Sequence, residues 1–206
     1  MDVETLLTTT RTVRRKLDLD RAVPIEVIED SLRIAQQAPA AGNLLSALRW
    51  VIVRDAGLRA KIAPIVRGAA ATIMPQREQL TEEQNRVMNS ARHLLDNLER
   101  VPVLAIPCLP GPPPQGHVYQ TSYYGSAYPA IWSFQLALRI HGLGSSMCAY
   151  HLIDKEPEVS ALLGIPSDVS QITMLAVAYT TQTDFQPAVR PPAEEITYID
   201  SWNRRP

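Results

Sequence analysis

The chain has 206 residues, a length that favours a single domain spanning residues 1–206 around one core. Its 20 Lys and Arg side chains are balanced by 21 Asp and Glu, so no broad positive surface is expected to draw the protein to nucleic acid or to an anionic membrane. Cys108 and Cys148 lack the spacing of a zinc site or a disulfide framework, so no metal is expected. The lack of a leader and of an apolar run of roughly 18 residues predicts a cytoplasmic protein.

A dense group of positive charges lies near the start of the chain. Arg11, Arg14, Arg15 and Lys16 fall within six residues, beside the hydroxyl of Thr12. Most basic runs of this kind are solvated helix ends or parts of surface ion-pair networks. The alternative is a phosphate site, because guanidinium groups bind phosphate through paired hydrogen bonds. Taken alone, the segment favours the first interpretation.

The first half of the chain predicts alternating helices and strands. Apolar residues at helical spacing after Pro24 predict an amphipathic helix that stops before Pro39, and the β-branched run at residues 50–53 predicts a buried strand. Further helices are expected over about 57–71 and 81–100, the second with a capping box at Thr81 and Gln84. A strand is expected over 101–108, where two prolines favour an edge or an interrupted strand over a regular central one.

The second half opens with an irregular, proline-rich stretch. Pro110-Gly111-Pro112-Pro113-Pro114 is incompatible with helix and predicts a loop over about 109–124 that passes over a binding site. Ser126 is expected to cap an apolar helix that ends at Gly142-Leu143-Gly144. Strands near 145–150 and 171–179 and a helix over about 157–163 complete an α+β or three-layer α/β class.

Five features follow one another in a characteristic order. They are the basic segment, the loop Pro39-Ala40-Ala41-Gly42-Asn43 after a helix, the strand at Trp50, the Pro129 helix with its glycine exit, and Arg190-Pro191-Pro192-Ala193-Glu194-Glu195. Together they resemble the FMN-dependent nitroreductase family over almost the full chain. The resemblance implies an α+β fold, a three-layer α-β-α sandwich with a central, mainly antiparallel sheet. It also implies an extensive homodimer in which both chains build each of two flavin sites.

The resemblance assigns a part of the flavin site to each motif. In this family the early basic segment binds the flavin phosphate and the pyrimidine edge, and a carboxyl-terminal cation, matched by Arg190, also reaches the phosphate. The Pro39–Asn43 loop matches the segment that the other subunit places beside the flavin ring, although alone it is typical of an ordinary helix stop. His151 aligns with the strand end that faces the flavin ring in this family and is therefore a candidate acid or base. A single histidine beside apolar residues more often has a structural role. The implied cofactor-binding residues are Arg11, Thr12, Val13, Arg14, Pro39, Ala40, Ala41, Asn43, Ala149, Tyr150, His151 and Arg190.

Three positions depart from the family pattern. Thr10 stands where many relatives carry another arginine, and Leu45-Ser46-Ala47 replaces the commoner glutamine-proline-tryptophan. Trp132-Ser133 occupies a position often held by glutamine-asparagine. These differences bear on the affinity for the flavin and on the choice of substrate.

The implied activity is that of an FMN-dependent NAD(P)H oxidoreductase. Such an enzyme takes a hydride from NADH or NADPH onto flavin N5 and reduces a nitroaromatic, a quinone or an activated alkene by a ping-pong mechanism, without an obligatory side-chain nucleophile. Tyr123, Tyr124, Tyr128 and Trp132 are candidates for lining the acceptor slot, or for core packing or the dimer interface. The alternatives are another flavin-site activity on the same fold (oxidase, dehalogenase or flavin cleavage) and a non-catalytic flavin-binding or redox-sensing protein.

Overall fold

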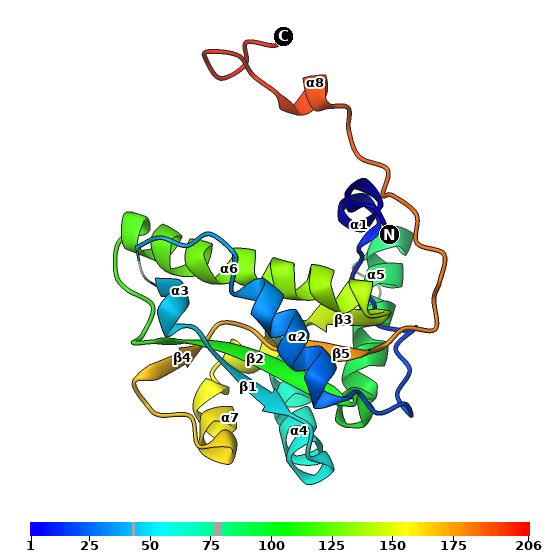
Figure 1. The fold of residues 1–206 in the computed structure, drawn as a ribbon, viewed down its shortest axis with the longest axis vertical. Coiled ribbons are helices and arrows are strands. Elements are labelled where there is room, and N and C mark those ends of the chain that lie inside the picture. The colour runs from blue at the N-terminus through cyan, green and yellow to red at the C-terminus, as the bar shows by residue number, and fades with distance from the viewer. Residues whose placement is uncertain (43, 76–79) are drawn as a thin grey trace.

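A five-stranded antiparallel sheet forms the centre of the molecule (Figure 1). The computed structural model describes residues 1–42, 44–75 and 80–206. The strand order is β1-β2-β5-β3, and the short β4 pairs with the far end of β2. The strands are β1 (Arg49–Val53), β2 (Val103–Pro110), β3 (Leu143–Met147), β4 (Val169–Gln171) and β5 (Leu175–Tyr179).

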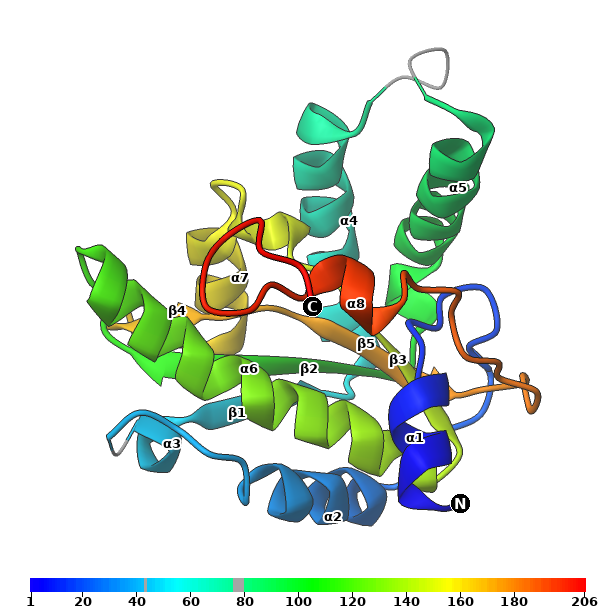
Figure 2. The ribbon, with the colours of Figure 1, turned by 90° about the horizontal axis from the view of Figure 1, so that it is seen from above.

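Helices cover both faces of the sheet (Figure 2). One face packs on α2 (Ile25–Ala35) and α6 (His117–Ile140), and the other on α4 (Ala56–Ile73), α5 (Glu82–Asp96) and α7 (Glu156–Leu163). Successive side chains of β2 divide between the two cores: Leu104 and Ile106 enter one, Val103 and Ala105 the other. This alternation is the period-2 pattern of a strand buried on both faces. The predicted α+β three-layer sandwich with an antiparallel sheet is confirmed.

Short elements lie around this body. They are α1 (Val3–Thr9), α3 (Leu44–Ala47), α8 (Ala193–Ile196) and the 3₁₀ turns η2 (Leu98–Arg100) and η3 (Tyr150–Leu152). In Figure 2, α3 lies near the first half of α6 and α1 lies at the opposite end of that helix. The tail that carries α8 extends away from the body in Figure 1. Within the described ranges, no helix is long and apolar enough to cross a membrane.

The position of β2 corrects one prediction. Its prolines favoured an edge or an interrupted strand, but β2 is one continuous strand and lies between β1 and β5. The carbonyl of Pro107 accepts the N–H of Ile172, so the nitrogen of Pro107, which lacks a proton, faces the break between β4 and β5. The strand predicted over 171–179 is divided there, so the missing N–H falls where no regular ladder would use it.

The start of α6 corrects a second prediction. The irregular chain was expected to reach residue 124, but α6 begins at His117 directly after Gly116, whose φ is 92°. Ser126 therefore does not cap the helix. It lies inside α6, where its hydroxyl donates to the carbonyl of Ser122 at 2.7 Å. Burial of Tyr123 against the core, at 4% exposure, supports the added turns.

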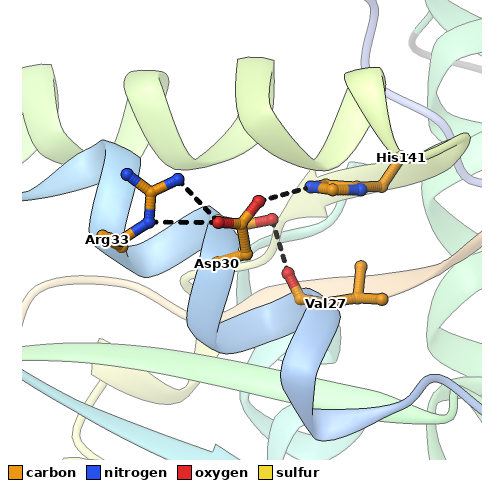
Figure 3. Close-up of polar contacts among 5 residues, drawn as sticks. Val27, Asp30, Arg33 and His141 are labelled. Atoms are coloured by element: carbon orange, nitrogen blue, oxygen red, sulfur yellow. Dashed lines mark hydrogen bonds and ion pairs between the residues drawn. The ribbon is translucent and has the colours of Figure 1, made fainter.

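Other local predictions are confirmed by cap geometry. Thr81 and Gln84 form the expected capping box at the start of α5, and Gly164 ends α7 with a left-handed φ of 66°. Asp30 of α2 lies between Arg33 and His141 (Figure 3). The hydrogen bonds to Arg33 and then His141 lower the pKa of the Asp30 carboxyl. This cluster ties α2 to the end of α6.

Candidate functional site

The basic segment, residues 11–16, is attached to the edge of the sheet. Thr12 forms a parallel bridge with Ser145 of β3, and the N–H of Val13 donates to the Ser145 carbonyl at 2.9 Å. Val13 is 5% exposed and packs on Gly144. A Cβ atom at Gly144 would lie 2.8 Å from the Cβ of Val13, so only glycine permits this close approach. The segment is therefore held in place by backbone pairing and by one tight apolar contact.

The positive charges of the basic segment lack acidic partners. Among the described residues, Arg14, Arg15 and Lys16 form no ion pair, and Arg11 donates from Nη2 to the carbonyl of Gln186 at 3.2 Å. The segment follows α1 and its cap, Thr10, and is not part of that helix. Within the described part of the chain, a surface ion-pair network is thus not the reason for this charge density. Cations without partners are suited to an anionic ligand.

Thr10 faces away from this ligand site. Its hydroxyl donates to the carbonyl of Leu6 at 2.6 Å, and the side chain is 8% exposed. The position where relatives carry arginine thus completes the end of α1 in this chain. Compared with a segment that carries arginine at this position, the basic segment therefore has one positive charge fewer.

The turn after β3 lies beside Arg14. Ala149 is exposed at the start of η3, and Tyr150 is half-buried behind it. Burial and then the neighbouring Cys148 raise the pKa of the Tyr150 phenol, whereas the charges of Arg14 and Arg92 oppose this shift. The phenol therefore lies close to cations from two different elements, the basic segment and α5. The structure thus places Arg14 close to the turn that carries Ala149 and Tyr150.

His151 lies beneath this turn and is wholly buried. Neither ring nitrogen has a hydrogen-bond partner among the described residues, and Gln171 and the backbone of Cys148 are near neighbours without hydrogen-bonding geometry. Burial lowers the pKa of His151 from 6.5 to about 4, an effect that these two neighbours oppose in part. The imidazole is neutral at physiological pH and has no exposed surface. Its role is therefore structural: the buried ring packs beneath the turn at Ala149 and Tyr150 and supports it.

The loop before α3 is fixed by α6. The N–H of Ala41 donates to the hydroxyl of Ser126 at 2.9 Å, and Gly42 adopts a φ of 54°. Pro39 is exposed and Ala40 is half-buried, so the loop presents small side chains at the surface. The predicted ligand Asn43 lies outside the described residues. Ser126 was predicted as a cap, and no sequence signal identified it as the anchor of this loop.

The two halves of the predicted site lie far apart along α6, one near its middle and the other beyond its carboxyl end. The Pro39–Ala41 loop contacts Ser126, whereas the basic segment pairs with β3, which follows the end of α6 at Ile140. At 1.5 Å per residue, the helix between Ser126 and Ile140 is roughly 20 Å long. Figure 2 shows the same separation, with α3 and α1 near opposite ends of the helix. Within one chain, these two groups of residues do not meet.

The aromatic residues of α6 divide into two groups. Tyr123 belongs to the core, and its hydroxyl donates to the carbonyl of Gly111 at 3.2 Å. Tyr124 packs partly buried against Tyr123, edge to face at 5.3 Å between ring centroids. Tyr128 and Trp132 are 42% and 41% exposed and lie one turn apart. For Tyr123, core packing is the correct one of the predicted roles.

The altered segment Leu45-Ser46-Ala47 forms most of α3. Leu45 and Ser46 of this segment line, together with Trp50, a cavity of about 380 Å³ at the surface. A second and wider depression of about 640 Å³ lies beside the basic segment, between Arg15 and the polar face of α5. The participation of α5 was missed from the sequence, because single polar residues on an amphipathic helix give no signal of their own.

Arg190 lies in the tail that leaves the body. Phe185 anchors the start of this tail, 8% exposed and with the guanidinium of Arg139 stacked 3.9 Å above its ring. Arg190 itself is exposed and makes no hydrogen bond or ion pair with any described residue. It follows Gln186, the contact of Arg11, by four residues, so an extended chain keeps it within about 14 Å of that contact.

Both cysteines are buried free thiols. Burial raises the pKa of Cys108 to about 12 and that of Cys148 to about 11, so neither thiol is reactive at neutral pH. The expectation that both are ordinary buried thiols is confirmed. In the described part of the chain, no three His, Cys, Asp or Glu side chains gather into a group that could hold a metal.

Comparison with known proteins identifies the family of the chain. The model of the nitroreductase family matches residues 7–179, and the chain belongs to this family. A search of curated proteins gave no match.

Solved structures share the fold at low sequence identity. An iodotyrosine deiodinase bound to FMN and 3-iodo-L-tyrosine is 24% identical, with a TM-score of 0.72 over 98% of this chain and 100% of that one. A BluB-like flavoprotein from Clostridium difficile 630 is 19% identical, with a TM-score of 0.72 over 98% and 100%. A mutant of NfnB, an FMN- and NADPH-dependent nitroreductase from Sphigopyxis sp. strain HMH, is 18% identical, with a TM-score of 0.70 over 98% and 100%.

Proposed function

We propose that this protein is an FMN-dependent oxidoreductase that takes electrons from NADH or NADPH and reduces a small planar, electron-poor acceptor. Nitroaromatics, quinones and activated alkenes are the acceptor classes. The observation that carries the proposal is the unpaired charge of Arg14 and Arg15, held by the Ser145 bridge next to the exposed turn at Ala149. Such a group of cations fits the phosphate and the electron-rich edge of a flavin.

The residues of the chain would bind and orient the cofactor. FMN, when bound, supplies the redox chemistry by accepting a hydride and delivering electrons to the acceptor. Arg11, Thr12 and Arg14 would hold the phosphate and the pyrimidine edge, with Arg190 as a further cation. The backbone of Ala149 would face the ring. His151, buried and neutral, would fix the position of that backbone without exchanging a proton with substrate.

The site would be completed by a second copy of the chain. The Pro39–Ala41 loop contacts the middle of α6 and the basic segment lies beyond its carboxyl end, so we infer that the loop at each flavin comes from a partner subunit. The surface of one chain also exposes apolar residues that a partner would cover. They include Tyr128, Trp132 and Ile140 along α6, at 42%, 41% and 58% exposure, and Ile196 and Trp202 in the tail, at 69% and 81%.

Reconstitution with FMN tests the proposed function directly. The protein mixed with FMN should show the absorption bands of bound oxidised flavin and a higher melting temperature. NADH or NADPH should bleach these bands under anaerobic conditions, and an added quinone should restore them with ping-pong kinetics. A protein that stays colourless with excess FMN would refute the proposal. Bleaching without turnover on any acceptor would instead indicate a non-catalytic role.

The choice of acceptor is open to one specific alternative. The chain shares its fold with an iodotyrosine deiodinase as well as with nitroreductases. An acceptor panel should therefore include a halogenated phenol beside a nitroaromatic and a quinone, with and without oxygen. Halide release faster than quinone reduction would favour dehalogenation over the proposed reaction.

Substitution of single arginines tests the orientation of the cofactor. By resemblance, Arg14 lies near the part of the flavin ring that gains negative charge on reduction. A unit charge at roughly 4 Å is worth about 4 kcal/mol at an effective dielectric of 20. Screening leaves about 1 to 2 kcal/mol, or about 20 to 45 mV for a two-electron couple. Arg14→Gln should therefore weaken FMN binding and lower the reduction potential.

Two further variants serve as comparisons for Arg14→Gln. Arg190→Gln should weaken FMN binding through the distant phosphate and leave the reduction potential of the bound cofactor unchanged. Arg33→Gln removes a charge from an exposed ion pair on α2 and should change neither quantity. Spectroelectrochemical titration of the saturated proteins separates the three cases. An unchanged potential in Arg14→Gln would place this residue on another part of the flavin.

Sedimentation tests the shared site. The FMN-bound protein should sediment as a dimer, and a chain that ends at Gln186 should dissociate more readily because it lacks the apolar tail residues. A stable monomer with full FMN affinity and full activity would contradict the shared site while leaving the cofactor assignment intact.

A further inference from the structure

A second cluster of arginines lines a pocket outside the proposed flavin site. The pocket has a volume of about 260 Å³ and lies between the loop before α2, the chain after β1, the base of α4 and η2. In Figure 1 these elements gather where α2 begins. Its charged lining consists of Arg21, Arg54, Arg59, Arg100 and Asp20, which we call the arginine pocket. It shares no lining residue with the basic segment or the η3 turn.

The guanidinium groups at the rim of the arginine pocket are only partly engaged. Arg100 forms an ion pair with Asp20 at 3.0 Å, but the Asp20 side chain is 86% exposed, so water screens this pair strongly. The guanidinium of Arg21 stacks 3.5 Å from the centre of the Tyr179 ring, an arrangement that occupies its face and leaves its N–H edge available. Arg54 forms no hydrogen bond or ion pair with any described residue.

Arg59 provides a fixed donor at the base of the pocket. Its Nη1 donates to the backbone carbonyls of Glu99 and Val101, which hold the guanidinium in one orientation. Its Nε is buried and has no partner among the described residues. Burial lowers the pKa of Arg59, and the nearby Asp55 opposes this shift. A dehydrated guanidinium with an unsatisfied donor is stabilised by a bound anion.

Apart from Asp20, the described acidic residues near the pocket lie outside its lining. Asp18 accepts the backbone N–H groups of Asp20 and Arg21, each at 3.2 Å, and Asp55 accepts the backbone N–H of Leu58 at 2.8 Å. Both carboxylates keep their charge, but neither of them lines the pocket, and nor does Glu99, which pairs with Arg67. Four arginines face one exposed aspartate inside a small concave surface. An anion in the pocket would be attracted by the excess of positive charge in this lining.

We propose that the arginine pocket binds a phosphate dianion, either inorganic phosphate or the phosphate group of a small ester. Planar guanidinium groups match two phosphate oxygens at once, and several of them around one cavity match the tetrahedral anion. The volume lies below the roughly 300 to 1,000 Å³ of sites for larger organic ligands, which favours a compact anion over a nucleotide. This site is independent of the proposed flavin site.

Titration with phosphate tests the proposal on the full-length protein saturated with FMN, so that the flavin site does not take up the added phosphate. Melting temperature and binding heat are measured while phosphate replaces chloride at constant ionic strength. The expected result is a saturable rise in melting temperature, because the ligand binds only the folded state. Glycerol phosphate in a parallel titration distinguishes the source: tighter binding than inorganic phosphate identifies an ester, and weaker binding identifies the free anion.

Three variants locate the binding site. Arg54→Gln should weaken phosphate binding by about tenfold, as expected for the loss of one charge-assisted contact, and it leaves the fold intact because the side chain is exposed and unpaired. Arg21→Gln should act similarly. Lys61→Gln removes an exposed charge from the same helix as Arg59 and should bind like the wild type. The difference in phosphate affinity between Arg54→Gln and Lys61→Gln tests the arginine pocket even if the protein does not bind FMN, because neither residue belongs to the proposed flavin site. A non-saturating response, or equal affinities in Arg54→Gln and Lys61→Gln, would overturn the proposal.

Discussion

Acidification should destabilise this protein in part through His151. The unfolded chain takes up a proton on this imidazole as the pH falls through about 6.5, whereas the folded chain resists protonation until about pH 4 because the ring is buried. The unfolded state therefore binds more protons across this window, and the free energy of unfolding falls as the pH decreases. At about 1.4 kcal/mol per pH unit, the full effect is about 3 kcal/mol. About 2 kcal/mol of it is lost between pH 7.5 and pH 5.

The assay is urea unfolding at pH 7.5, 6 and 5, followed by tryptophan fluorescence at one fixed protein concentration. Other groups contribute to the acid sensitivity, among them Asp30, whose lowered carboxyl pKa also makes stability fall at low pH. The informative quantity is thus the difference between the wild type and His151→Leu, which keeps a similar volume without a titrating group. The variant should lose about 2 kcal/mol less than the wild type between pH 7.5 and pH 5.

A matched control separates His151 from histidine content in general. His117 is exposed at the start of α6, so His117→Gln should retain the full pH dependence of the wild type. If His151→Leu and the wild type lost the same free energy between pH 7.5 and pH 5, the imidazole would not be held neutral by burial. The assigned role of His151 as a neutral support would then be wrong.

Three further predictions follow from individual contacts. Gly144→Ala should lower the free energy of unfolding by about 1 to 3 kcal/mol in urea because the added Cβ would meet Val13. Gly68→Ala, with no atom near its Cβ position, should raise it by about 0.5 to 1 kcal/mol, and equal effects of the two variants would contradict the tight contact. Ser126→Ala should cost about 1 kcal/mol, because a backbone N–H of the loop before α3 loses its acceptor; a neutral result would show that water replaces the hydroxyl. Cys108 should resist a thiol reagent at pH 8 until urea is added, and rapid labelling of the native protein would contradict its burial.

The sequence predicted the elements whose signals are local. Periodicity and caps located α2, α4, α5 and α7 within a few residues, because a capping box or a left-handed glycine depends only on residues that are adjacent in the sequence. The errors arose where a distant partner decides the outcome. Pro107 is tolerated in a central strand because β4 and β5 break opposite it, and no residue near Pro107 carries that information. Likewise, the added turns of α6 depend on the burial of Tyr123.

In the candidate site, too, the sequence predicted local features and missed those that depend on distant residues. The charge density of the basic segment is visible in the sequence, but its attachment to Ser145 and the contact of Val13 with Gly144 depend on residues that are more than a hundred positions away. Arg92 next to Tyr150, and the arginine pocket, bring together residues from separate elements and have no sequence pattern. Spacing in a sequence identifies residues that act together along one element, and it does not identify residues that meet across the fold.

The basic segment connects the stability of the fold with the binding of its ligand. A short bridge and one apolar contact hold it to β3, and the carbonyl of Lys16 accepts the N–H of Thr181, while the three consecutive cations Arg14, Arg15 and Lys16 repel one another without an acidic partner in the described chain. An anion bound there removes this repulsion and adds contacts that the free protein lacks, so part of its binding free energy appears as added stability. The order of the segment and the affinity for the ligand should then change together. A substitution that loosens the contact with Gly144 should weaken ligand binding even though it removes no charge, because the cations would no longer be held in one arrangement.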